Sequence, residues 1–418
     1  MKTSNLRNVI CLFSILLLFS SCNSDKDITS FSIGNYSATI EAATNNVLLL
    51  LPMGTDLTNL TPTISITGQS VSPASGVPQN FTIPVPYTVK AIDGSTKMYK
   101  VIVRPDPNII LIQPETFTVC NTVNFNMIHV PGGLTFPTGM NDSSTATVPN
   151  AYWIAETEAT YELYECIRNQ QSDYGYSIGD PGLMGSNGTT ANMNPQHPVT
   201  AVNWFSAVVF TNLLSEVLGL NPVYRCGTNI IKDNSTASNC NGFNITPDPL
   251  SNGFRLPTNN EWELAARWKG GNSSYGAIEV PAGSGKYWTR GNYASGANEH
   301  VWDNVSYQAN LNQAPTQTVT WYNANSGGST KEVKLKNPNA LGLYDMSGNV
   351  SEWCFDTSSG GLQTNLLVRG GGYWDPAHFM SIGYKYFYTT PGNAVDTSIG
   401  FRLSRAVPAN PNQAQTQI

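Results

Sequence analysis

The sequence predicts an α+β protein in which an all-β sandwich precedes a larger domain of short helices, short strands and long loops. Three observations favour this class. Charged residues make up only 12% of the chain, and Asn, Thr, Ser and Gly take their place. Alternating apolar segments separated by prolines fill much of residues 23–106, as in a sandwich with protected edges. Apolar residues at helical spacing follow later, for example before Leu218.

Length and charge limit the possible partners. The 418 residues allow two or three domains. The net charge is −6 and the pI about 5.3, and no run of Lys or Arg follows the first few residues. Nucleic-acid binding needs a basic footprint. We therefore predict no nucleic-acid partner and no electrostatic membrane patch.

The N-terminus predicts export. Lys2 and Arg7 precede an apolar run at residues 9–19, which is too short for a stable membrane span. Small residues before Cys22 and polar residues after it resemble a bacterial lipoprotein signal. Residues 1–22 are therefore predicted as a lipoprotein signal peptide, with lipid on Cys22 holding the chain to a bacterial outer membrane or cell surface. A plain secretory signal is the alternative.

The cysteines allow one disulfide to be suggested for an oxidising compartment. Without Cys11, which is removed with the signal, and Cys22, five cysteines remain, at positions 120, 166, 226, 240 and 354. No CxxC motif is present, so zinc-ribbon and thioredoxin-like sites are not expected. Cys226 and Cys240 could close a small polar loop. The odd number leaves at least one thiol unpaired.

Strand signals dominate the first part of the chain. Residues 47–51 suit a strand buried on both faces, and residues 63–67 alternate between apolar and polar. Residues 87–91 and 99–103 flank a loop containing Asp93 and a glycine, which is a hairpin signal.

These strands carry no candidate catalytic cluster. Residues 55–103 resemble the cadherin-like, immunoglobulin-like sandwich repeats of bacterial surface lipoproteins. This resemblance implies that residues 23–106 form a spacer between the membrane and the next domain, with residues 107–125 as a linker.

Helices are expected in the larger domain. One is predicted near residues 161–166, and a second, with an apolar stripe, ends at about Leu218. Thr258 is a plausible N-cap of a third helix, because Glu261 follows three residues later. The remainder as far as Gly372 is expected to be mostly loop.

The C-terminal segment, residues 368–403, has regular ends and an irregular middle. Arg369 and three glycines open it, and Ile-Gly-Phe-Arg-Leu closes it. The middle follows neither a strand nor a helix period and carries many rings: Trp374, His378, Phe379, Tyr384, Tyr386, Phe387 and Tyr388. Aromatic side chains give large contact area with few rotors to freeze. We predict that this cluster is a binding site; the alternative is that most of the rings lie in the core.

Several motifs carry a resemblance to a known family. In chain order they are GFRLPT and EWELAAR (253–267), NALGLYDMSGNVSEW (339–353), RGGGYW (369–374) and IGFRL (399–403). Together they resemble the formylglycine-generating enzyme (sulfatase-modifying factor) family. That resemblance implies a C-type-lectin-like fold with two helices, little regular strand and long packed loops over residues 126–406. Residues 407–418 are expected to be a disordered tail.

The same resemblance argues against the family's oxidase chemistry. That chemistry uses two cysteines near the chain end, whose thiolates bind copper(I). The last cysteine here is Cys354, so we expect no copper and no oxidase activity. The four histidines are scattered, and no HExxH motif occurs. A non-catalytic protein is therefore expected, and a superfamily enzyme, oxidase-like or transferase-like, with unrecognised chemistry is the alternative.

The resemblance also implies a structural calcium ion. Its ligands would be the side chains of Asp345 and Glu352 and the backbone carbonyls of Gly348 and Val350. Calcium prefers such oxygen ligands, and a tight turn containing glycine can aim several carbonyls inward. The alternative for Glu352 is a buried acid satisfied by backbone amides.

With the catalytic pair absent, a binding role remains. Surface lipoproteins of this family include variable proteins diversified by retroelements, such as treponemal variable lipoproteins, and their variable ligand-binding segment has similar ends. The resemblance implies a framework of Arg369, the three glycines and residues 399–402. The predicted ligand-binding residues are Tyr373, Trp374, Asp375, His378, Phe379, Tyr384, Tyr386, Tyr388 and Asp396, with Lys385 also tuning polarity.

The predicted function is therefore that of a surface-displayed lipoprotein. It would bind a protein or glycan ligand through C-terminal aromatic loops, whose diversification the resemblance implies. An envelope lipoprotein with only a structural role is a further alternative.

Overall fold

The computed structural model describes residues 24–34, 36–52, 55–106, 114–187, 194–240, 245–270, 277–301, 313–357, 366–388 and 395–407. The predicted signal peptide with Cys22, and residues 408–418 of the predicted tail, lie outside the described residues. The chain divides into two compact units, Met1–Leu111 and Ile112–Ile418. Among the described helices, none combines the length and apolarity needed to cross a membrane.

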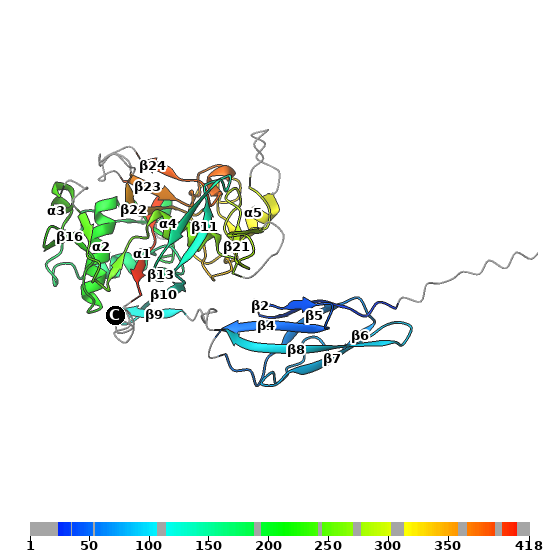
Figure 1. The fold of residues 1–418 in the computed structure, drawn as a ribbon. Coiled ribbons are helices and arrows are strands. Elements are labelled where there is room, and N and C mark those ends of the chain that lie inside the picture. The colour runs from blue at the N-terminus through cyan, green and yellow to red at the C-terminus, as the bar shows by residue number, and fades with distance from the viewer. Residues whose placement is uncertain are drawn as a thin grey trace, which may run out of the picture. The chain divides into compact units, whose positions relative to one another are not determined.

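The first unit is a sandwich of two sheets (Figure 1). Its strands are β1 (Ile28–Ile33), β2 (Tyr36–Ser37), β3 (Thr39–Glu41), β4 (Asn46–Pro52), β5 (Pro62–Ile66), β6 (Ser70–Ser72), β7 (Val85–Lys90) and β8 (Thr96–Asp106). One sheet has the order β2-β1-β5 and the other the order β3-β4-β8-β7-β6. Phe31, Phe81 and Tyr87 pack against one another in the core, with the Phe31 and Tyr87 ring centroids 5.6 Å apart.

Two strand predictions in this unit have different outcomes. The hairpin around Asp93 is confirmed, because β7 and β8 pair antiparallel on either side of it. The prediction that residues 47–51 are buried on both faces is wrong. Val47, Leu49 and Leu51 are buried, whereas Leu50 is 36% exposed. The run lies in β4, and only one face of its sheet covers the sandwich core, so every second leucine faces outward.

The second unit contains two main sheets. The first has the order β19-β26-β13-β10-β9 and the second the order β24-β23-β22-β25. Their strands are β9 (Glu115–Val119), β10 (Val123–Val130), β13 (Tyr152–Ala155), β19 (Phe254–Arg255), β22 (Ser351–Thr357), β23 (Leu366–Arg369), β24 (Tyr386–Tyr388), β25 (Ile399–Phe401) and β26 (Ser404–Ala406). The linker predicted at residues 107–125 needs correction, because β9 and the start of β10 form a hairpin within the first of these sheets.

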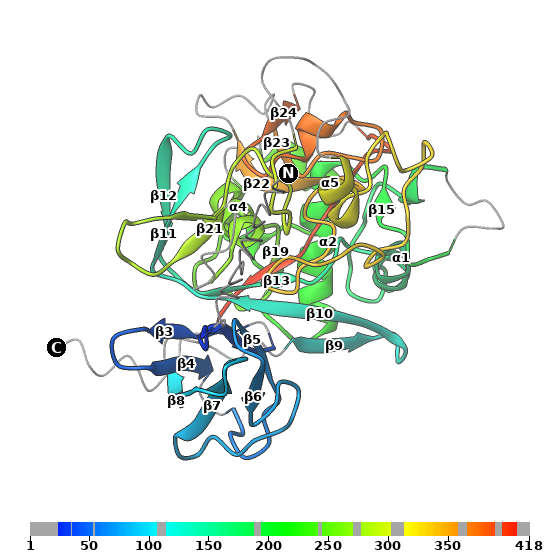
Figure 2. The same cartoon turned by 90° about the vertical axis from the view of Figure 1, so that its right-hand side faces the viewer.

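Small sheets surround the two main ones. They are formed by β11 (Leu134–Thr138) with β12 (Ser144–Val148), β14 (Leu183–Met184) with β15 (Val199–Thr200), β16 (Tyr224–Cys226) with β17 (Asn229–Ile230) and β18 (Ile245–Pro247), and β20 (Ala277–Glu279) with β21 (Tyr287–Thr289). The β11–β12 hairpin stands at one side of this unit (Figure 2).

Five α-helices are described: α1 (Tyr161–Arg168), α2 (Trp204–Val217), α3 (Asn234–Asn239), α4 (Asn259–Arg267) and α5 (Gln313–Val319). The third predicted helix is α4, and its capping box is confirmed, since Thr258 and Glu261 bond reciprocally to each other's backbone. The single apolar stripe predicted for the second helix is wrong. All residues of α2 from Trp204 to Ser215 are buried, because this helix runs through the core.

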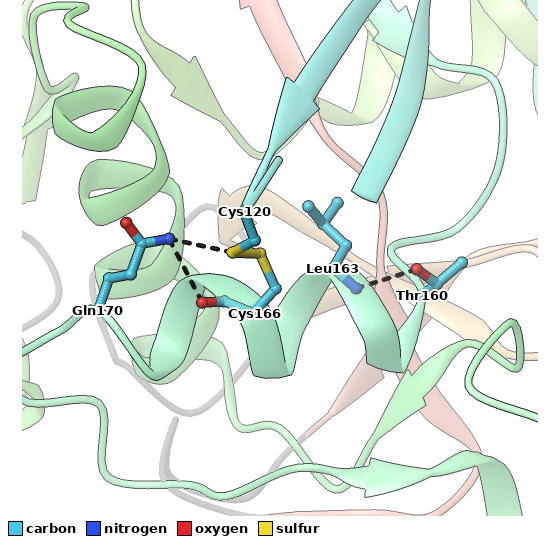
Figure 3. Close-up of a disulfide and its surroundings, with 5 residues drawn as sticks. All are labelled: Cys120, Thr160, Leu163, Cys166 and Gln170. Atoms are coloured by element: carbon cyan, nitrogen blue, oxygen red, sulfur yellow. Dashed lines mark hydrogen bonds between the residues drawn. A yellow bond between two sulfur atoms is a disulfide. The ribbon is translucent and has the colours of Figure 1, made fainter. Parts of the chain in front are cut away.

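Two disulfides brace the second unit. Cys226–Cys240 is confirmed as the closure of a small loop. Cys120–Cys166, which the sequence did not indicate, joins the turn between β9 and β10 to α1 (Figure 3). Among the cysteines of the described ranges, Cys354 is the free thiol, and it is buried.

Candidate binding face

Arg369, the last residue of β23, holds the middle of the C-terminal segment. The whole residue is only 2% exposed. Nη1 donates to the carbonyls of Ile382 at 3.0 Å and Tyr384 at 2.9 Å. Nε donates to Asn259 Oδ1 at 2.9 Å, and Nη2 also contacts Glu263. One arginine therefore connects β23, the start of α4 and the loop that carries Tyr384.

Glu263 balances this buried charge. Burial opposes its ionisation, but Arg369 and Arg267 outweigh that effect and hold its pKa below the ordinary value. Arg267 Nε and Nη2 donate to Glu263 Oε1 at 3.0 and 2.8 Å.

The glycines after Arg369 allow close packing. Gly371 has φ +71°, and a Cβ there would lie 2.4 Å from Met380 Cε and 2.8 Å from the Phe379 carbonyl oxygen. These atoms belong to the 3₁₀ helix η2 (Ala377–Met380). A side chain at residue 371 would push this turn away.

The closing end of the segment is fixed by Arg402. Its Nη2 lies 2.7 Å from Glu352 Oε1 in a fully buried ion pair. It also donates to the carbonyls of Ala155 and Tyr344, each at 2.8 Å. Because β22 pairs with both β23 and β25, the two ends of the segment lie in one sheet. The structure thus brings together the framework expected from the sequence.

Between these ends, some of the predicted rings reach the surface. Trp374 is 67% exposed and Tyr386 is 47% exposed. His378, Phe379 and Tyr384 are partly exposed and form a three-ring cluster. The Phe379 centroid lies 4.4 Å from that of His378 and 4.6 Å from that of Tyr384.

We call Trp374, His378, Phe379, Tyr384, Lys385 and Tyr386 the aromatic face. Burial raises the pKa of Tyr384, and the charges of Asp375 and Tyr386 add to the increase. Burial lowers the pKa of His378, although the Asp375 carboxylate opposes this. The imidazole therefore favours the neutral form.

Four predicted ligand-binding residues are not counted in this face because they pack against or bond to the framework. Tyr373 is 7% exposed, so its ring is not available as the exposed anchor expected from the sequence. Tyr388 is partly buried, with its ring edge-on to Trp353. Asp375 Oδ2 accepts from the Gly372 amide at 2.8 Å, and Asp396 Oδ1 accepts from the Ser398 amide at 2.7 Å. These two carboxylates hold turns of the framework.

A loop that the sequence did not single out supports the exposed tryptophan. Ser326 Oγ donates to the Tyr373 carbonyl at 2.9 Å, and the Asn323 amide donates to the Asp375 carbonyl at 3.1 Å. The indole of Trp374 passes close to Gly328. The adjacent glycines 327 and 328 marked a turn but gave no sign of its partner.

The predicted calcium segment is a buried turn with Asp345 at φ +55° and Gly348 at φ +86°. Asp345 Oδ2 accepts from the Lys334 amide, whereas the buried Oδ1 has no hydrogen-bond partner. Burial raises the pKa of Asp345 to about 6. An orphaned, buried carboxylate oxygen fits a cation ligand.

Glu352 fits this role less well. Both of its oxygens accept from Arg402, and Oε2 also accepts from Trp262 Nε1 at 2.7 Å. The alternative of a buried acid satisfied by backbone amides is wrong in its partners, because the side chains of Arg402 and Trp262 donate to Glu352. Across the described ranges, no group of three or more His, Cys, Asp or Glu side chains is placed to hold a metal. The calcium ion therefore stays a prediction.

Glu158 is a third acid in this region that the sequence did not reveal. It accepts from the Val350 amide at 2.9 Å and from Asn349 Nδ2 at 2.7 Å. Burial raises its pKa, and Asp345 and Glu352 raise it further. The guanidinium of Arg402 opposes the increase at both Glu158 and Asp345, although it bonds directly to Glu352.

Comparisons with known proteins agree with this architecture. Residues 113–407 match the model of the sulfatase-modifying factor enzyme 1-like domain, and residues 28–103 match the model described as SGBP, N-terminal. The chain is 26% identical over 292 residues to Chaperone protein LppX of Paenibacillus barcinonensis, covering 68% of this chain and 91% of that protein.

Two solved structures share the fold. Treponema denticola variable protein 1 is 27% identical with a TM-score of 0.52, covering 70% of this chain and 99% of that one. CarF is 29% identical with a TM-score of 0.50, covering 68% of this chain and 98% of that one. The predicted α+β, C-type-lectin-like fold is confirmed, and the chain belongs to the family of sulfatase-modifying factor enzyme 1-like domains.

Proposed function

We propose that this protein is a surface-displayed lipoprotein that binds a protein or glycan ligand through its aromatic face, without catalysis. The observation that carries the proposal is the exposure of Trp374 and Tyr386 on a segment whose backbone is held by Arg369. Lipid on Cys22 would hold the protein to a bacterial outer membrane or cell surface.

The face has the physical properties of a contact surface. Trp and Tyr are both frequent at binding hot spots, where they supply large contact area. The backbone beneath them is fixed by the Arg369 hydrogen bonds and the tight packing at Gly371. Binding would therefore order few groups, which favours affinity.

The comparisons support a binding role. Similarity to a treponemal variable protein and to a chaperone protein suggests a non-catalytic function, and it is compatible with a place at the cell surface. Diversification of the C-terminal segment would explain its aromatic, irregular sequence between fixed ends. Diversification can be tested in the genome. It predicts a near-copy of the coding segment that differs only at adenines and lies beside a reverse transcriptase gene.

The state of Cys354 also supports a non-catalytic role. Burial raises the pKa of this thiol well above its ordinary value. The thiolate is the form that binds metals and attacks substrates. Cys354 is therefore poorly suited to the oxidase chemistry known in the family.

Binding can be tested with purified protein on arrays of extracellular proteins and glycans. A ligand of the wild type should lose at least about tenfold in affinity when Trp374→Ala or Tyr386→Ala is introduced. Leu250→Ala is the matched control, because it removes another highly exposed apolar side chain, one outside the face.

Two results would contradict the proposal. One is that every ligand found binds the face variants as tightly as the wild type. The other is copper-dependent oxidation of a thiol peptide by the purified protein, which would establish an enzyme. Labelling with radioactive fatty acid, compared between the wild type and Cys22→Ser, tests the anchor separately.

A further inference from the structure

A polar cleft of about 370 Å³ opens in the second unit next to the aromatic face, with which it shares Lys385. Its walls come from the β11–β12 hairpin, the first turn of α4, and Gly383 with Lys385 of the C-terminal segment. The volume falls in the range of small-molecule sites. Unlike most such sites, it is lined mainly by hydroxyl and amide side chains, so its ligand should be rich in polar groups.

The two buried charged residues that line the cleft, Glu263 and Arg369, are paired with each other. Glu263 also binds Arg267, and the remaining donors of Arg369 are used by Asn259 and two carbonyls. Lys385 is the one charged group at the rim without an ion pair among the residues that line the cleft. A strongly charged ligand would therefore find little to recognise it.

The hairpin wall is fixed in position. Arg267 donates to the Gly139 carbonyl and to Asp142 Oδ1, each at 2.6 Å, and the Gly139 amide donates to Glu263 Oε1 at 2.9 Å. A Cβ on Gly383 would lie 2.3 Å from the carbonyl carbon of Gly139, so the opposite wall packs directly against the hairpin. The cleft is thus preformed, which reduces the entropy lost on binding.

Several neutral groups around the cleft are free for a ligand. The hydroxyls of Thr138, Ser144 and Thr145 and the Nδ2 group of Asn260 make no hydrogen bond to another residue in the described part of the chain. Hydroxyl groups both donate and accept, so they complement a ligand that carries many hydroxyls. We infer that this cleft is a binding site for a short neutral saccharide. The site shares only Lys385 with the aromatic face, and the inference holds whether or not that face binds a partner.

Calorimetry with neutral disaccharides tests this inference. The probes are maltose, cellobiose, xylobiose and mannobiose, and digalacturonate serves as a charged comparison. We expect at least one neutral disaccharide to bind. Thr138→Val, which removes one hydroxyl, should weaken it about two- to tenfold. Ser144→Trp, at an exposed position on the wall, should abolish binding by filling the cleft.

Two variants should leave disaccharide binding unchanged. Thr147→Val alters the same hairpin outside the cleft, where its hydroxyl bonds to Thr135. Trp374→Ala alters the aromatic face and leaves the cleft intact. The thermal unfolding temperature of each variant shows whether it is folded.

Three outcomes would overturn the inference. The first is no heat of binding with any neutral disaccharide up to about 10 mM. The second is tighter binding of digalacturonate than of every neutral probe. The third is loss of disaccharide binding in Trp374→Ala with unchanged binding in Thr138→Val and Ser144→Trp. That last result would place the sugar on the aromatic face and leave the proposed function standing.

Discussion

The buried guanidinium of Arg369 donates a hydrogen bond from Nη1 to the carbonyl oxygen of Tyr384 at 2.9 Å. Arg369, at the opening end of the C-terminal segment, thereby fixes the backbone of Tyr384, whose ring lies in the middle of that segment. The same guanidinium lies against the Glu263 carboxylate in an ion pair shielded from water. The position of the aromatic face and the stability of the second unit therefore depend on one side chain.

Replacing this side chain should destabilise the protein strongly. Arg369→Met keeps an unbranched chain but leaves part of the Glu263 charge and two carbonyls without donors. Loss of one partner of a buried, hydrogen-bonded ion pair costs roughly 3–5 kcal/mol. Urea unfolding should show a decrease of that size in the free energy of unfolding.

The control for this experiment is Arg225→Met. Arg225 pairs with Asp248 at 2.9 Å, but both side chains are about a quarter exposed. Such pairs contribute about 1 kcal/mol or less. Equal losses in the two variants would show that the buried network around Arg369 has no special role.

Truncation of two adjacent aromatic residues should change the free energy of unfolding by very different amounts. Tyr373 is buried and Trp374 is mostly exposed. Tyr373→Ala should cost about 3 kcal/mol in unfolding free energy, because it leaves a cavity in the core. Trp374→Ala should change this free energy by no more than about 0.5 kcal/mol. A large loss of stability in Trp374→Ala would mean that its ring is a packing residue.

Local signals in the sequence were sufficient for several elements. The hairpin at Asp93 and the capping box of Thr258 with Glu261 depend on residues close in sequence, so their structure could be predicted. The ends of the C-terminal segment were also predicted correctly, because glycines and a short strand have strong local preferences.

Interactions between distant residues could not be predicted. Nothing near Arg369 indicates Glu263 as its partner, and Glu158 lies far in sequence from Asp345 and Glu352. Which ring of a cluster faces outward also depends on tertiary packing. The sequence therefore could not show that Tyr373, predicted as a ligand-binding residue, is buried. The run at residues 47–51 suited two-sided burial, yet the sheet that contains it covers the core with one face.

The disulfides provide a test of long-range bracing. Cys120 and Cys166 are 46 residues apart, whereas Cys226 and Cys240 are 14 apart. By loop entropy, the longer crosslink should contribute about 4 kcal/mol and the shorter about 3 kcal/mol. Unfolding of the double variants Cys120→Ser/Cys166→Ser and Cys226→Ser/Cys240→Ser measures each contribution. A smaller loss of unfolding free energy in the first double variant than in the second would contradict this order. It would show that the turn between β9 and β10 keeps its position without the disulfide.

The stability of the second unit should depend on pH through Asp345. Burial raises the folded pKa of this carboxyl to about 6 from its ordinary 3.8. The folded state therefore holds this proton more tightly than the unfolded state. Its contribution to stability falls as the pH rises from about 4 to about 6, by about 3 kcal/mol in all.

Asp345→Asn isolates this effect. In the presence of a chelator, the variant should lack that part of the pH dependence and should be more stable than the wild type at pH 7. Urea unfolding at pH 4, 5, 6 and 7 measures the difference. Asp93→Asn is the contrasting control, because hydrogen bonds from Ser95 lower the pKa of Asp93. Identical pH profiles for the wild type and Asp345→Asn would contradict the prediction.

Calcium should reduce the loss of stability that ionisation of Asp345 causes as the pH rises. A bound cation favours the ionised carboxylate, so the orphaned Oδ1 of Asp345 would gain a partner and the decrease above pH 4 should flatten. A free calcium concentration of 100 times Kd should stabilise the wild type by about 2.7 kcal/mol. The unfolding temperature of Asp345→Asn should not rise, and magnesium, which demands stricter geometry, should act less. If calcium raises the unfolding temperature of both proteins equally, Asp345 is not a ligand; if it raises neither, the calcium prediction is wrong.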